Sequence, residues 1–587
     1  MPWFSGSQYT VRRLLLLCLP LLLLSSLGLL ALRGKPDKGG NGQGARTRLT
    51  SATPIIRLQG TGNLPADASH SLHPSLASFS IETAFFEAYV GNASSPNLLT
   101  RHLLDNLKQR TGVPAEVRIG GITADSTYWN ASQSVGLSNF VDTAGVLHNT
   151  TVGPDFWKSM SLLPEGTKIT VNLNLDDLRY QSALDVARSA FEGLPAKQLV
   201  AFEIGNEPDH YHSFTPKNYS SIWGEWANNI TSTLGLKRPF FQVAATAEDP
   251  LWPYDAPGAA SQLGCVSALG AGANRDGVVA SCSEHSYQYS VCDPVRTAVA
   301  TLPNLVNHTR LAMFLDLWQP RVREVRRQLG SHAFVNGEYN SVSCSGKGGV
   351  SNTFGQALWL LDTTLYAASI NISRLYIHQG GPLALQSSTQ LNHGALREPL
   401  TERSCFRLSF YDLWYPVQNT NGPVKVFPSY YAYLFVTEAL GFSKSTRIAN
   451  LFPGRQANGS TITTQLGDVS SGQLVSYGFW DLDGPLKTRY PSKLALLNLQ
   501  IYNASQTGAT ARPNATFDIS AYVKDPGQRV KIRRLQAPGA DIIEGNATLW
   551  AGQNFGSGSP IGQLNEEITT GPLVNVRASE AALVFLY

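Results

Sequence analysis

Residues 199–208 read Leu-Val-Ala-Phe-Glu-Ile-Gly-Asn-Glu-Pro. The apolar start of this stretch predicts a buried strand, and Pro208 ends the strand because proline has no N–H to donate to a sheet. Asn206 and Glu207 therefore stand at the carboxyl end of a strand, where α/β barrels carry their functional side chains. Alone, Asn-Glu-Pro also fits a turn with a solvated glutamate.

A second stretch repeats this pattern. Residues 333–340 read Ala-Phe-Val-Asn-Gly-Glu-Tyr-Asn, so that apolar residues again lead through a glycine to a glutamate, Glu338. Strand-like runs alternate with helix-like periodic segments around both stretches, which is typical of a parallel sheet with crossover helices. The expected strands are 78–83, 115–119, 168–175, 199–204, 240–245, 278–289, 332–338 and 373–379, and clear helical periodicity covers 98–110, 182–191 and 359–370.

Roughly eight strand–helix units predict an α/β fold of the (β/α)₈ TIM barrel type, over residues 77–423. A doubly wound sheet is the alternative, but no glycine-rich nucleotide-binding turn follows any of the strands. In such a barrel Glu207 lies about half-way round and Glu338 near the end, so that the two face each other across one mouth.

The pattern changes after about residue 424. Short strand-like runs separated by Gly, Pro, Asn and Asp predict an antiparallel β-sandwich domain over residues 424–587. The expected strands are 461–466, 473–480, 493–502, 515–519, 529–535 and 581–587. Residues 34–76 are expected to form a linker, in which residues 50–58 supply an extra strand.

The composition indicates a globular protein without a polyanion groove. Hydrophobic residues make up 43% and charged residues 15% of the 587-residue chain. The net charge of +4 is misleading, because residues 1–50 carry a net +6 and leave the remainder at −2. A nearly neutral body argues against nucleic acid as a partner.

The N-terminus carries a targeting segment within residues 1–33. Arg12 and Arg13 precede the apolar run 14–32, which is longer than the usual core of a signal peptide and near the lower length of a membrane span. The segment is therefore either a cleaved signal peptide, giving an extracellular protein, or an uncleaved signal anchor that holds the body outside the membrane. In the second case residues 34–48 form a flexible stalk.

The rest of the chain fits an oxidising, glycosylating compartment. It contains eleven Asn-x-Ser/Thr sites, so N-glycans are expected. Five cysteines follow the apolar run, for which two disulfides and one free thiol are the simplest count, with the pairing left open. Neither a CxxC pair nor an HExxH motif occurs, and no metal or other cofactor is expected.

Two carboxylates facing each other across a small cavity suit the cleavage of a glycosidic bond. One must be protonated to donate to the leaving oxygen, and the other must stay ionised to attack the sugar carbon, so their surroundings must separate the two pKa values.

These motifs resemble a known family. Gly205-Asn206-Glu207-Pro208 and Asn336-Gly337-Glu338-Tyr339-Asn340 resemble the acid/base and nucleophile motifs of glycoside hydrolase family 79, which holds β-glucuronidases and heparanase. Residues 118–123, Arg-Ile-Gly-Gly-Ile-Thr, resemble the family's turn after the second strand, and His285-Ser286-Tyr287 its His-x-Tyr on the sixth. Residues 546–555 resemble the C-terminal domain of the fungal-type members.

The resemblance implies a retaining mechanism in which Glu207 is the general acid/base and Glu338 the nucleophile. It implies that Asn206 binds the sugar's 2-hydroxyl and that Tyr287 holds Glu338 ionised. The retaining mechanism implies carboxyl groups about 5–5.5 Å apart. Further substrate-binding candidates are His285, Glu82, Asn174, Asp176, Gly120, Gly121, Tyr376 and His378, the last two for the uronate carboxylate together with backbone N–H groups of residues 343–346.

Three functions are compatible with these residues. The first is an exo-β-glucuronidase that releases glucuronate or 4-O-methyl-glucuronate from extracellular oligo- or polysaccharides. The second is a heparanase-like endo-β-glucuronidase, which needs basic clusters lining its cleft to meet sulfates. The third is a non-catalytic carbohydrate-binding protein of the cell wall.

Overall fold

The computed structural model describes residues 55–58, 60–142, 147–252, 256–381, 408–419, 422–451, 473–506 and 511–586. The apolar run 14–32, Cys405, the glycosylation site at Asn458 and the strand expected at 461–466 lie outside these residues. Within them, no helix combines the length and the apolar character that crossing a bilayer requires.

Eight parallel strands close into a barrel, as the alternating pattern predicts. Each strand pairs with the next one along the chain, and the last pairs with the first. In chain order the strands are β2 (Ala77–Glu82), β5 (Val117–Gly120), β9 (Ile169–Leu173), β10 (Leu199–Ile204), β11 (Phe241–Thr246), β12 (Val279–Ser290), β13 (Phe334–Ser343) and β14 (Leu375–Gln379). Most of their residues are buried on both faces, because side chains fill the barrel inside and helices cover it outside.

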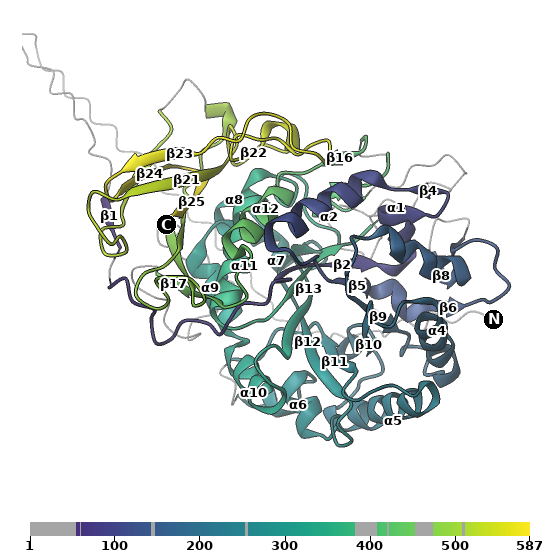
Figure 1. Ribbon diagram of the computed structural model, residues 1–587. Helices are drawn as coiled ribbons and strands as arrows, with labels where there is room; N and C mark the ends of the chain where they lie inside the picture. The colour runs from purple at the N-terminus through teal and green to yellow at the C-terminus, as the bar shows by residue number, and fades with distance from the viewer. Residues whose placement is uncertain are drawn as a thin grey trace, which may run out of the picture. The chain divides into compact units, whose positions relative to one another are not determined.

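Helices follow the barrel strands and surround them (Figure 1). They are α2 (Leu98–Thr111), α3 (Pro154–Lys158), α4 (Tyr180–Gly193), α5 (Pro216–Leu234), α6 (Cys265–Gly270), α10 (Gln319–Leu329), α11 (Phe354–Ser369) and α12 (Tyr430–Leu440). Shorter helices are α1 (Phe86–Val90), α7 (Pro294–Val299), α8 (Leu302–Leu305) and α9 (His308–Asp316). A small separate sheet contains β6 (Thr127–Trp129), β8 (Leu147–Val152) and β7 (Leu137–Val141). Two strand pairs are β3 (Gly91–Asn92) with β4 (Ser95–Pro96) and β15 (Trp414–Tyr415) with β16 (Lys425–Val426).

Helix α12 belongs to the barrel. It follows the last barrel strand and packs against α2, α11 and strand β2, and the hydroxyl of Tyr433 lies 3.0 Å from that of Tyr339, beside Glu338. The antiparallel domain therefore begins at Thr446, later than the boundary expected at residue 424.

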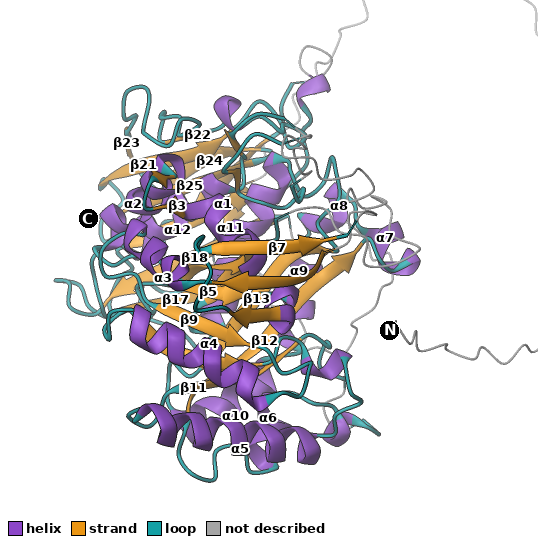
Figure 2. Cartoon of the chain, turned by 90° about the vertical axis from the view of Figure 1, so that its right-hand side faces the viewer, coloured by secondary structure: helices purple, strands orange, loops and turns teal. Residues whose placement is uncertain are grey.

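The C-terminal domain packs a seven-stranded sheet on a three-stranded one. The larger sheet contains β17 (Thr446–Asn450), β18 (Leu474–Asp481), β19 (Lys493–Asn498), β25 (Glu580–Phe585), β21 (Arg529–Gln536), β22 (Leu549–Trp550) and β23 (Glu567–Thr570); the smaller contains β20 (Asn514–Asp518), β24 (Leu573–Arg577) and β1 (Ile55–Arg57). Figure 2 labels β21 and β25 of the larger sheet and β24 of the smaller one. Strand β1 comes from the segment before the barrel and pairs parallel with β20. A shared apolar core, which includes Phe517 and Val584, lies between the sheets.

Within the described residues, two disulfides join neighbouring parts of the barrel. Cys265 at the start of α6 pairs with Cys282 in β12, and both are fully buried. Cys292, just after β12, pairs with Cys344, just after β13. The second bond therefore links the carboxyl ends of two neighbouring strands at the mouth of the barrel.

Candidate active site

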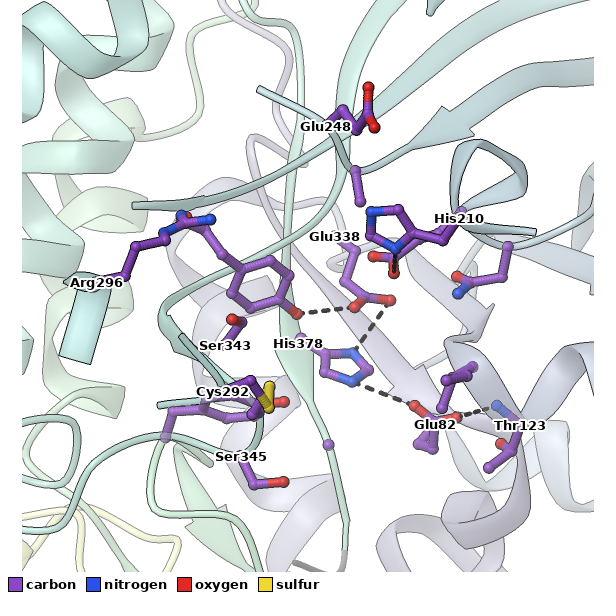
Figure 3. A pocket seen from close by; sticks show the side chains of 18 of the residues that line it. Glu82, Thr123, His210, Glu248, Cys292, Arg296, Glu338, Ser343, Ser345 and His378 are labelled. Atoms are coloured by element: carbon purple, nitrogen blue, oxygen red, sulfur yellow. Dashed lines mark hydrogen bonds and ion pairs between the residues drawn. A yellow bond between two sulfur atoms is a disulfide. The ribbon is translucent and has the colours of Figure 1, made fainter. Parts of the chain in front are cut away.

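A cavity of about 760 Å³ opens at the carboxyl ends of the barrel strands (Figure 3). It contains six of the side chains that the sequence nominates, which come from five different strands or the turns directly after them. These side chains are Glu82, Asn206, Glu207, Tyr287, Glu338 and His378.

Glu207 and Glu338 face each other across this cavity. One carboxylate oxygen of each, together with a ring nitrogen of His285, lie within 4.8 Å of one another. Such a spacing also suits metal ligands, but Glu338 already has close partners for both of its oxygens. Oε2 lies 2.9 Å from Nη1 of Arg118, and Oε1 accepts a 2.8 Å hydrogen bond from Tyr287. The arrangement is that of two paired carboxylates.

The surroundings of Glu338 favour its ionised form. Burial alone would raise the pKa of this carboxyl, but the charges of His378, His285 and Arg118 outweigh burial and lower the pKa below its ordinary value. Nδ1 of His378 lies 3.5 Å from Oε2 of Glu338. An ionised carboxylate held in a fixed orientation can act as a nucleophile.

Glu207 has two histidine partners. Nδ1 of the buried His285 lies 3.0 Å from Oε1, and Nδ1 of the half-exposed His210 lies 3.5 Å from Oε2. Burial would raise the pKa of Glu207, but hydrogen bonds to His210 and His285 outweigh burial and lower it. The hydrogen bond with Glu207 raises the pKa of His210 to about 9. Glu207 and His210 therefore titrate as one pair that shares a proton.

The backbone holds Glu207 in an uncommon conformation. Its φ is 53°, in the left-handed region, and its N–H donates to the carbonyl of Ala245 on the neighbouring strand. Ala244 and Ala245 also have positive φ values, of 80° and 55°. Such strain in non-glycine residues persists where the surroundings enforce it, and it clusters at functional sites.

Arg118 links Glu338 to Asn206, the residue before Glu207, although this role was not predicted. Its fully buried guanidinium binds Glu338, Glu203 at 2.6 Å, and Oδ1 of Asn206 at 2.8 Å. A sequence signal for this role exists, because a charged residue inside the short apolar strand before Gly120 must find partners within the barrel.

The two glycines after Arg118 allow close approach of functional side chains. A Cβ atom on Gly120 would lie 2.7 Å from the guanidinium carbon of Arg118, and one on Gly121 would lie 1.9 Å from Oε2 of Glu82. Gly121 also has a φ of +83°. Their role is therefore to make room for Arg118 and Glu82, and neither lines the cavity.

Glu82 and His378 form a chain that leads to Glu338. Nε2 of His378 lies 3.2 Å from Oε2 of Glu82, while Oε1 of Glu82 accepts a 2.6 Å hydrogen bond from the N–H of Thr123 (Figure 3). Burial alone would lower the pKa of His378, but Glu338 and Glu82 outweigh burial and raise it. The imidazole of His378 is thus placed between two carboxylates on one wall of the cavity.

Besides Gly120 and Gly121, four nominated residues do not line the cavity. His285 lies behind Glu207, Asn174 is buried and accepts from the N–H of Asp177, and Asp176 is half exposed and pairs with His212 at 3.1 Å. The expectation that Tyr376 binds the uronate carboxylate is not met. Although Tyr376 shares a face of β14 with His378, it lies deeper in the barrel and donates a 2.7 Å hydrogen bond to Glu116, which precedes β5. It therefore belongs to the opposite, amino-terminal end of the strands.

Other residues at the cavity were not nominated. His210, Arg296 and Tyr411 line it, and so does the expected turn at Ser343, Cys344 and Ser345. His210 could have been found, because it follows Glu207 by three residues in a turn begun by Pro208. Tyr411 comes after a long segment without clear periodicity, and no neighbouring motif marks it as His210 is marked by Glu207 and Pro208.

Asp125 fixes the turns on which Asn206 and Glu207 stand. Its Oδ1 accepts from the N–H of Leu175 at 3.1 Å, and its Oδ2 accepts from the N–H of Asn206 at 3.0 Å. Burial raises the pKa of Asp125 to about 8. Asp125 thereby joins the ends of β9 and β10.

Comparisons with known proteins show what this chain resembles. Residues 477–583 match the C-terminal β domain of glycosyl hydrolase family 79. A β-glucuronidase of Neurospora crassa is 27% identical over 524 residues, covering 83% of this chain and 85% of that protein. A β-glucuronidase of Aspergillus niger is 27% identical over 554 residues, covering 88% of this chain and 90% of that protein.

The fold also matches a crystal structure. A 4-O-α-L-rhamnosyl-β-D-glucuronidase from Fusarium oxysporum 12S superposes with a TM-score of 0.69 at 22% identity, covering 90% of this chain and all of that chain. This likeness extends over the barrel and the β domain together. The predicted resemblance to glycoside hydrolase family 79 is thus confirmed, and this chain is a glycoside hydrolase.

Proposed function

We propose that this protein is a retaining exo-β-glucuronidase that releases glucuronate, or its 4-O-methyl ether, from extracellular glycans. The observation that carries the proposal is the pair of carboxylates whose oxygens lie within 4.8 Å, in a cavity at the mouth of the barrel. Retaining enzymes hold their carboxyl groups about 5–5.5 Å apart, whereas inverting enzymes need about 6.5–9.5 Å to admit a water. The two fungal relatives support glucuronides as the substrate class.

In the first step, Glu338 attacks the anomeric carbon and the bond to the leaving oxygen breaks. Glu207 delivers a proton to that oxygen, so that the leaving group departs as a neutral alcohol and the sugar becomes an ester of Glu338. The proton comes from the cluster of Glu207 and His210, whose two side chains share it as a coupled pair.

In the second step, water replaces the leaving group. Glu207, now ionised, takes a proton from this water as its oxygen attacks the anomeric carbon, and Glu338 departs as a carboxylate. Arg118 and Tyr287 stabilise that carboxylate through the hydrogen bonds described above. The product has the same anomeric configuration as the substrate.

Asn206 and the turn after β13 orient the sugar. Because Oδ1 of Asn206 accepts from Arg118, its amide nitrogen is the atom that donates to the 2-hydroxyl. The uronate carboxylate is bound by backbone N–H groups of the turn Ser343–Ser345, which lines the cavity beside Tyr411. This turn has φ values of 62° at Cys344 and 72° at Ser345.

The heparanase-like alternative has less support. Arg321 pairs with Glu284 at 2.7 Å, and Lys531 and Arg533 both pair with Glu566. In the part of the chain that the structure describes, neither of these basic groups lines the catalytic cavity. A sulfated polysaccharide would find few unpaired cations there.

The proposal includes an extracellular location. Residues 14–32 direct the chain into the secretory pathway, as a cleaved signal or as an anchor, and N-glycans attach to exposed sites such as Asn92, Asn130 and Asn218. The site at Asn307 is an exception, because this side chain is 2% exposed and caps helix α9.

The test is hydrolysis of 4-nitrophenyl β-D-glucuronide beside the corresponding β-glucoside, β-xyloside and β-galactoside, with the first-formed anomer followed by NMR. We expect the glucuronide to be preferred and the β-anomer to appear first. Preference for a neutral sugar would overturn the uronate assignment, and an α-anomer appearing first would overturn retention. A Glu338→Ala variant with normal activity would overturn the role of Glu338.

A further inference from the structure

A cavity of about 410 Å³ lies at the amino-terminal end of the barrel strands, at the opposite end from the catalytic pair. Its wall is built from residues at or just before the starts of the strands and from the loop between α10 and β13. The proposed reaction uses none of these residues. The charged side chains and histidines of the wall are His73, Glu116, Lys168, His332 and Arg374.

Arg374, the residue before β14, is largely buried but lacks close partners. Its side chain is 15% exposed, and its only ion pair among the described residues joins Nη1 to Oε2 of Glu116 at 3.6 Å. That distance is longer than a hydrogen bond. Nε is buried and has no hydrogen-bond partner in the described part of the chain. Because an unpaired buried donor is costly, this guanidinium lacks an acceptor.

Glu116 does not supply the missing acceptor. Its Oε2 already accepts the 2.7 Å hydrogen bond from Tyr376, and its Oε1 lies 4.0 Å from Nε2 of His73. Arg118, at the other end of the same barrel, donates hydrogen bonds from Nε and from both of its terminal nitrogens. Arg374 therefore has donors left for a ligand, which Arg118 has already committed to its neighbours.

The wall of the cavity carries more positive than negative charge. Burial would raise the pKa of Glu116, but Arg374 and His73 outweigh burial and lower it, so this carboxyl is ionised at neutral pH. Burial and the charge of Arg374 lower the pKa of His73 to about 4, so this ring is neutral. The pKa of His332 is lowered as well, by burial and by Arg374. Arg374 and the exposed Lys168 thus set two cations against one carboxylate, which favours an anion in the cavity.

Neutral hydrogen-bond donors belong to the same wall. Nδ1 of His73 accepts from the N–H of Ser75 at 3.2 Å, so the proton of the neutral ring is carried by Nε2. Thr170 and Ser331 add hydroxyl groups. An oxyanion accepts hydrogen bonds from all of these groups, whereas a cation or an apolar ligand would leave Arg374 without an acceptor.

We propose that this cavity binds a small tetrahedral oxyanion, phosphate or sulfate, between Arg374 and Lys168. The fork of an arginine side chain matches such an anion, and a lysine contributes a point charge beside it. The volume of about 410 Å³ is typical of small-molecule sites, so the anion is either a free ion or a group carried by a sugar. Since the bound anion would join the starts of β9 and β14, it should stabilise the barrel. This site goes beyond the proposed function and does not depend on it.

The experiment is calorimetric titration of the protein with inorganic phosphate, sulfate and glucose 6-phosphate. We expect saturable binding of one anion per chain, and no binding of glucose. Tighter binding of glucose 6-phosphate than of phosphate would assign the site to a sugar-borne anion, and equal binding would assign it to the free ion. If potassium chloride at matched ionic strength reproduces the heats, the effect is general screening and the proposal is overturned.

The matched variants are Lys168→Ala and Lys197→Ala. Lys168 lines the cavity and is exposed, so the variant should fold and should bind phosphate about tenfold more weakly, the loss expected for one charge-assisted hydrogen bond. Lys197 is also exposed and lies just before β10 at the same end of the barrel, but it does not line the cavity. Its variant should bind phosphate as the parent does.

Melting temperatures provide a second readout. Phosphate and sulfate stabilise many proteins by exclusion from their surfaces, so only the difference between the two variants is diagnostic. We expect phosphate to raise the melting temperature less in Lys168→Ala than in the parent and in Lys197→Ala. Equal rises in all three proteins, together with equal calorimetric affinities, would show that water fills the cavity and would overturn the proposal.

The catalytic cavity is the competing location for an anion. Phosphate that inhibits hydrolysis of 4-nitrophenyl β-D-glucuronide competitively, with an inhibition constant equal to the calorimetric Kd, would place the ion there and overturn the proposal. Calorimetry reads the binding directly, so a protein that hydrolyses no glucuronide would contradict the proposed function and leave the anion site to be judged by the two lysine variants.

Discussion

Arg118 and Glu338 form an ion pair that solvent hardly reaches. The distance from Nη1 to Oε2 is 2.9 Å, and the two side chains are 0% and 7% exposed. Because the same guanidinium also binds Glu203, one cation compensates two buried carboxylates on β10 and β13. The pair therefore serves the stability of the barrel and the charge state of the proposed nucleophile together.

Arg118→Met should destabilise the fold and impair catalysis. Removal of one partner from a buried ion pair leaves an uncompensated charge and costs about 3–5 kcal/mol. Urea denaturation measures this loss, and Arg118→Lys, which keeps the charge without the forked geometry, is the matched control. An unchanged denaturation midpoint in Arg118→Met would show that Glu203 and Glu338 do not depend on Arg118.

Glu207→Gln should lower the rate of hydrolysis by an amount that depends on the leaving group. Loss of a general acid lowers the rate by about 10²–10⁴-fold where the leaving oxygen needs a proton, as in 4-methylphenyl β-D-glucuronide. A 2,4-dinitrophenyl group leaves without a proton, so its first step should hardly change. Pre-steady-state kinetics separates these steps. The control is Glu248→Gln, which removes another carboxylate of the same cavity and should affect both substrates equally. Equal losses for both substrates in Glu207→Gln would contradict the acid role of Glu207.

His210→Gln should move the alkaline limb of the pH–activity profile to lower pH. In the intact pair the proton is lost near the pKa of His210, about 9, because Glu207 stabilises the imidazolium. Without His210 the proton must be held by Glu207 alone. We expect a shift of at least one pH unit in kcat/KM, and an unchanged limb would remove His210 from the proton path.

The same histidine predicts a pH dependence of stability. Its pKa is raised in the folded state, so its contribution is fully present below about pH 6.5 and is lost as the pH rises through about 9. Since half of the side chain is exposed, the effect should be small. Melting temperatures of the parent and of His210→Gln should converge above pH 9, and a gap that widens there would contradict the assignment.

The two disulfides should have different functional effects. Replacing Cys292 and Cys344 by serine frees the turn that lines the cavity, so KM for the glucuronide should rise by about tenfold, because a hydrogen bond to a charged group contributes roughly 1.5–3 kcal/mol. Replacing Cys265 and Cys282, which are buried away from the cavity, should lower the melting temperature without changing KM. Equal KM values for both double variants would show that the turn holds its shape without the bond.

The sequence predicted the barrel because strand-like runs alternate with helix-like periodic segments, which is typical of a parallel sheet with crossover helices. Both glutamates were found because each follows an apolar run through a glycine at the end of such a strand. Helix α12 lies beyond the boundary expected at residue 424, although it packs against α2 and α11 of the barrel. It is apolar on nearly every face, because it packs against the barrel and the β domain at once, and that pattern carries no periodic signal.

The substrate-binding residues were harder to predict than the catalytic pair. Tyr376 and His378 alternate correctly along β14, yet periodicity does not tell how deep each lies in the barrel, and only His378 reaches the mouth. Arg118 was visible within a motif, but its partners lie 85 and 220 residues away along the chain. Contacts of this kind depend on the closed sheet and cannot be read from local spacing.

The closure of the barrel between β14 and β2 has a consequence for synthesis of the protein. Leu375 pairs with Ala77, so the first barrel strand must wait for nearly 300 further residues before its free edge is covered. At about 5–20 residues per second, this wait lasts roughly 15–60 s. An unpaired strand edge invites association with other chains. The growing polypeptide should therefore depend on chaperones during that interval, and slowing translation should lower the yield of active enzyme.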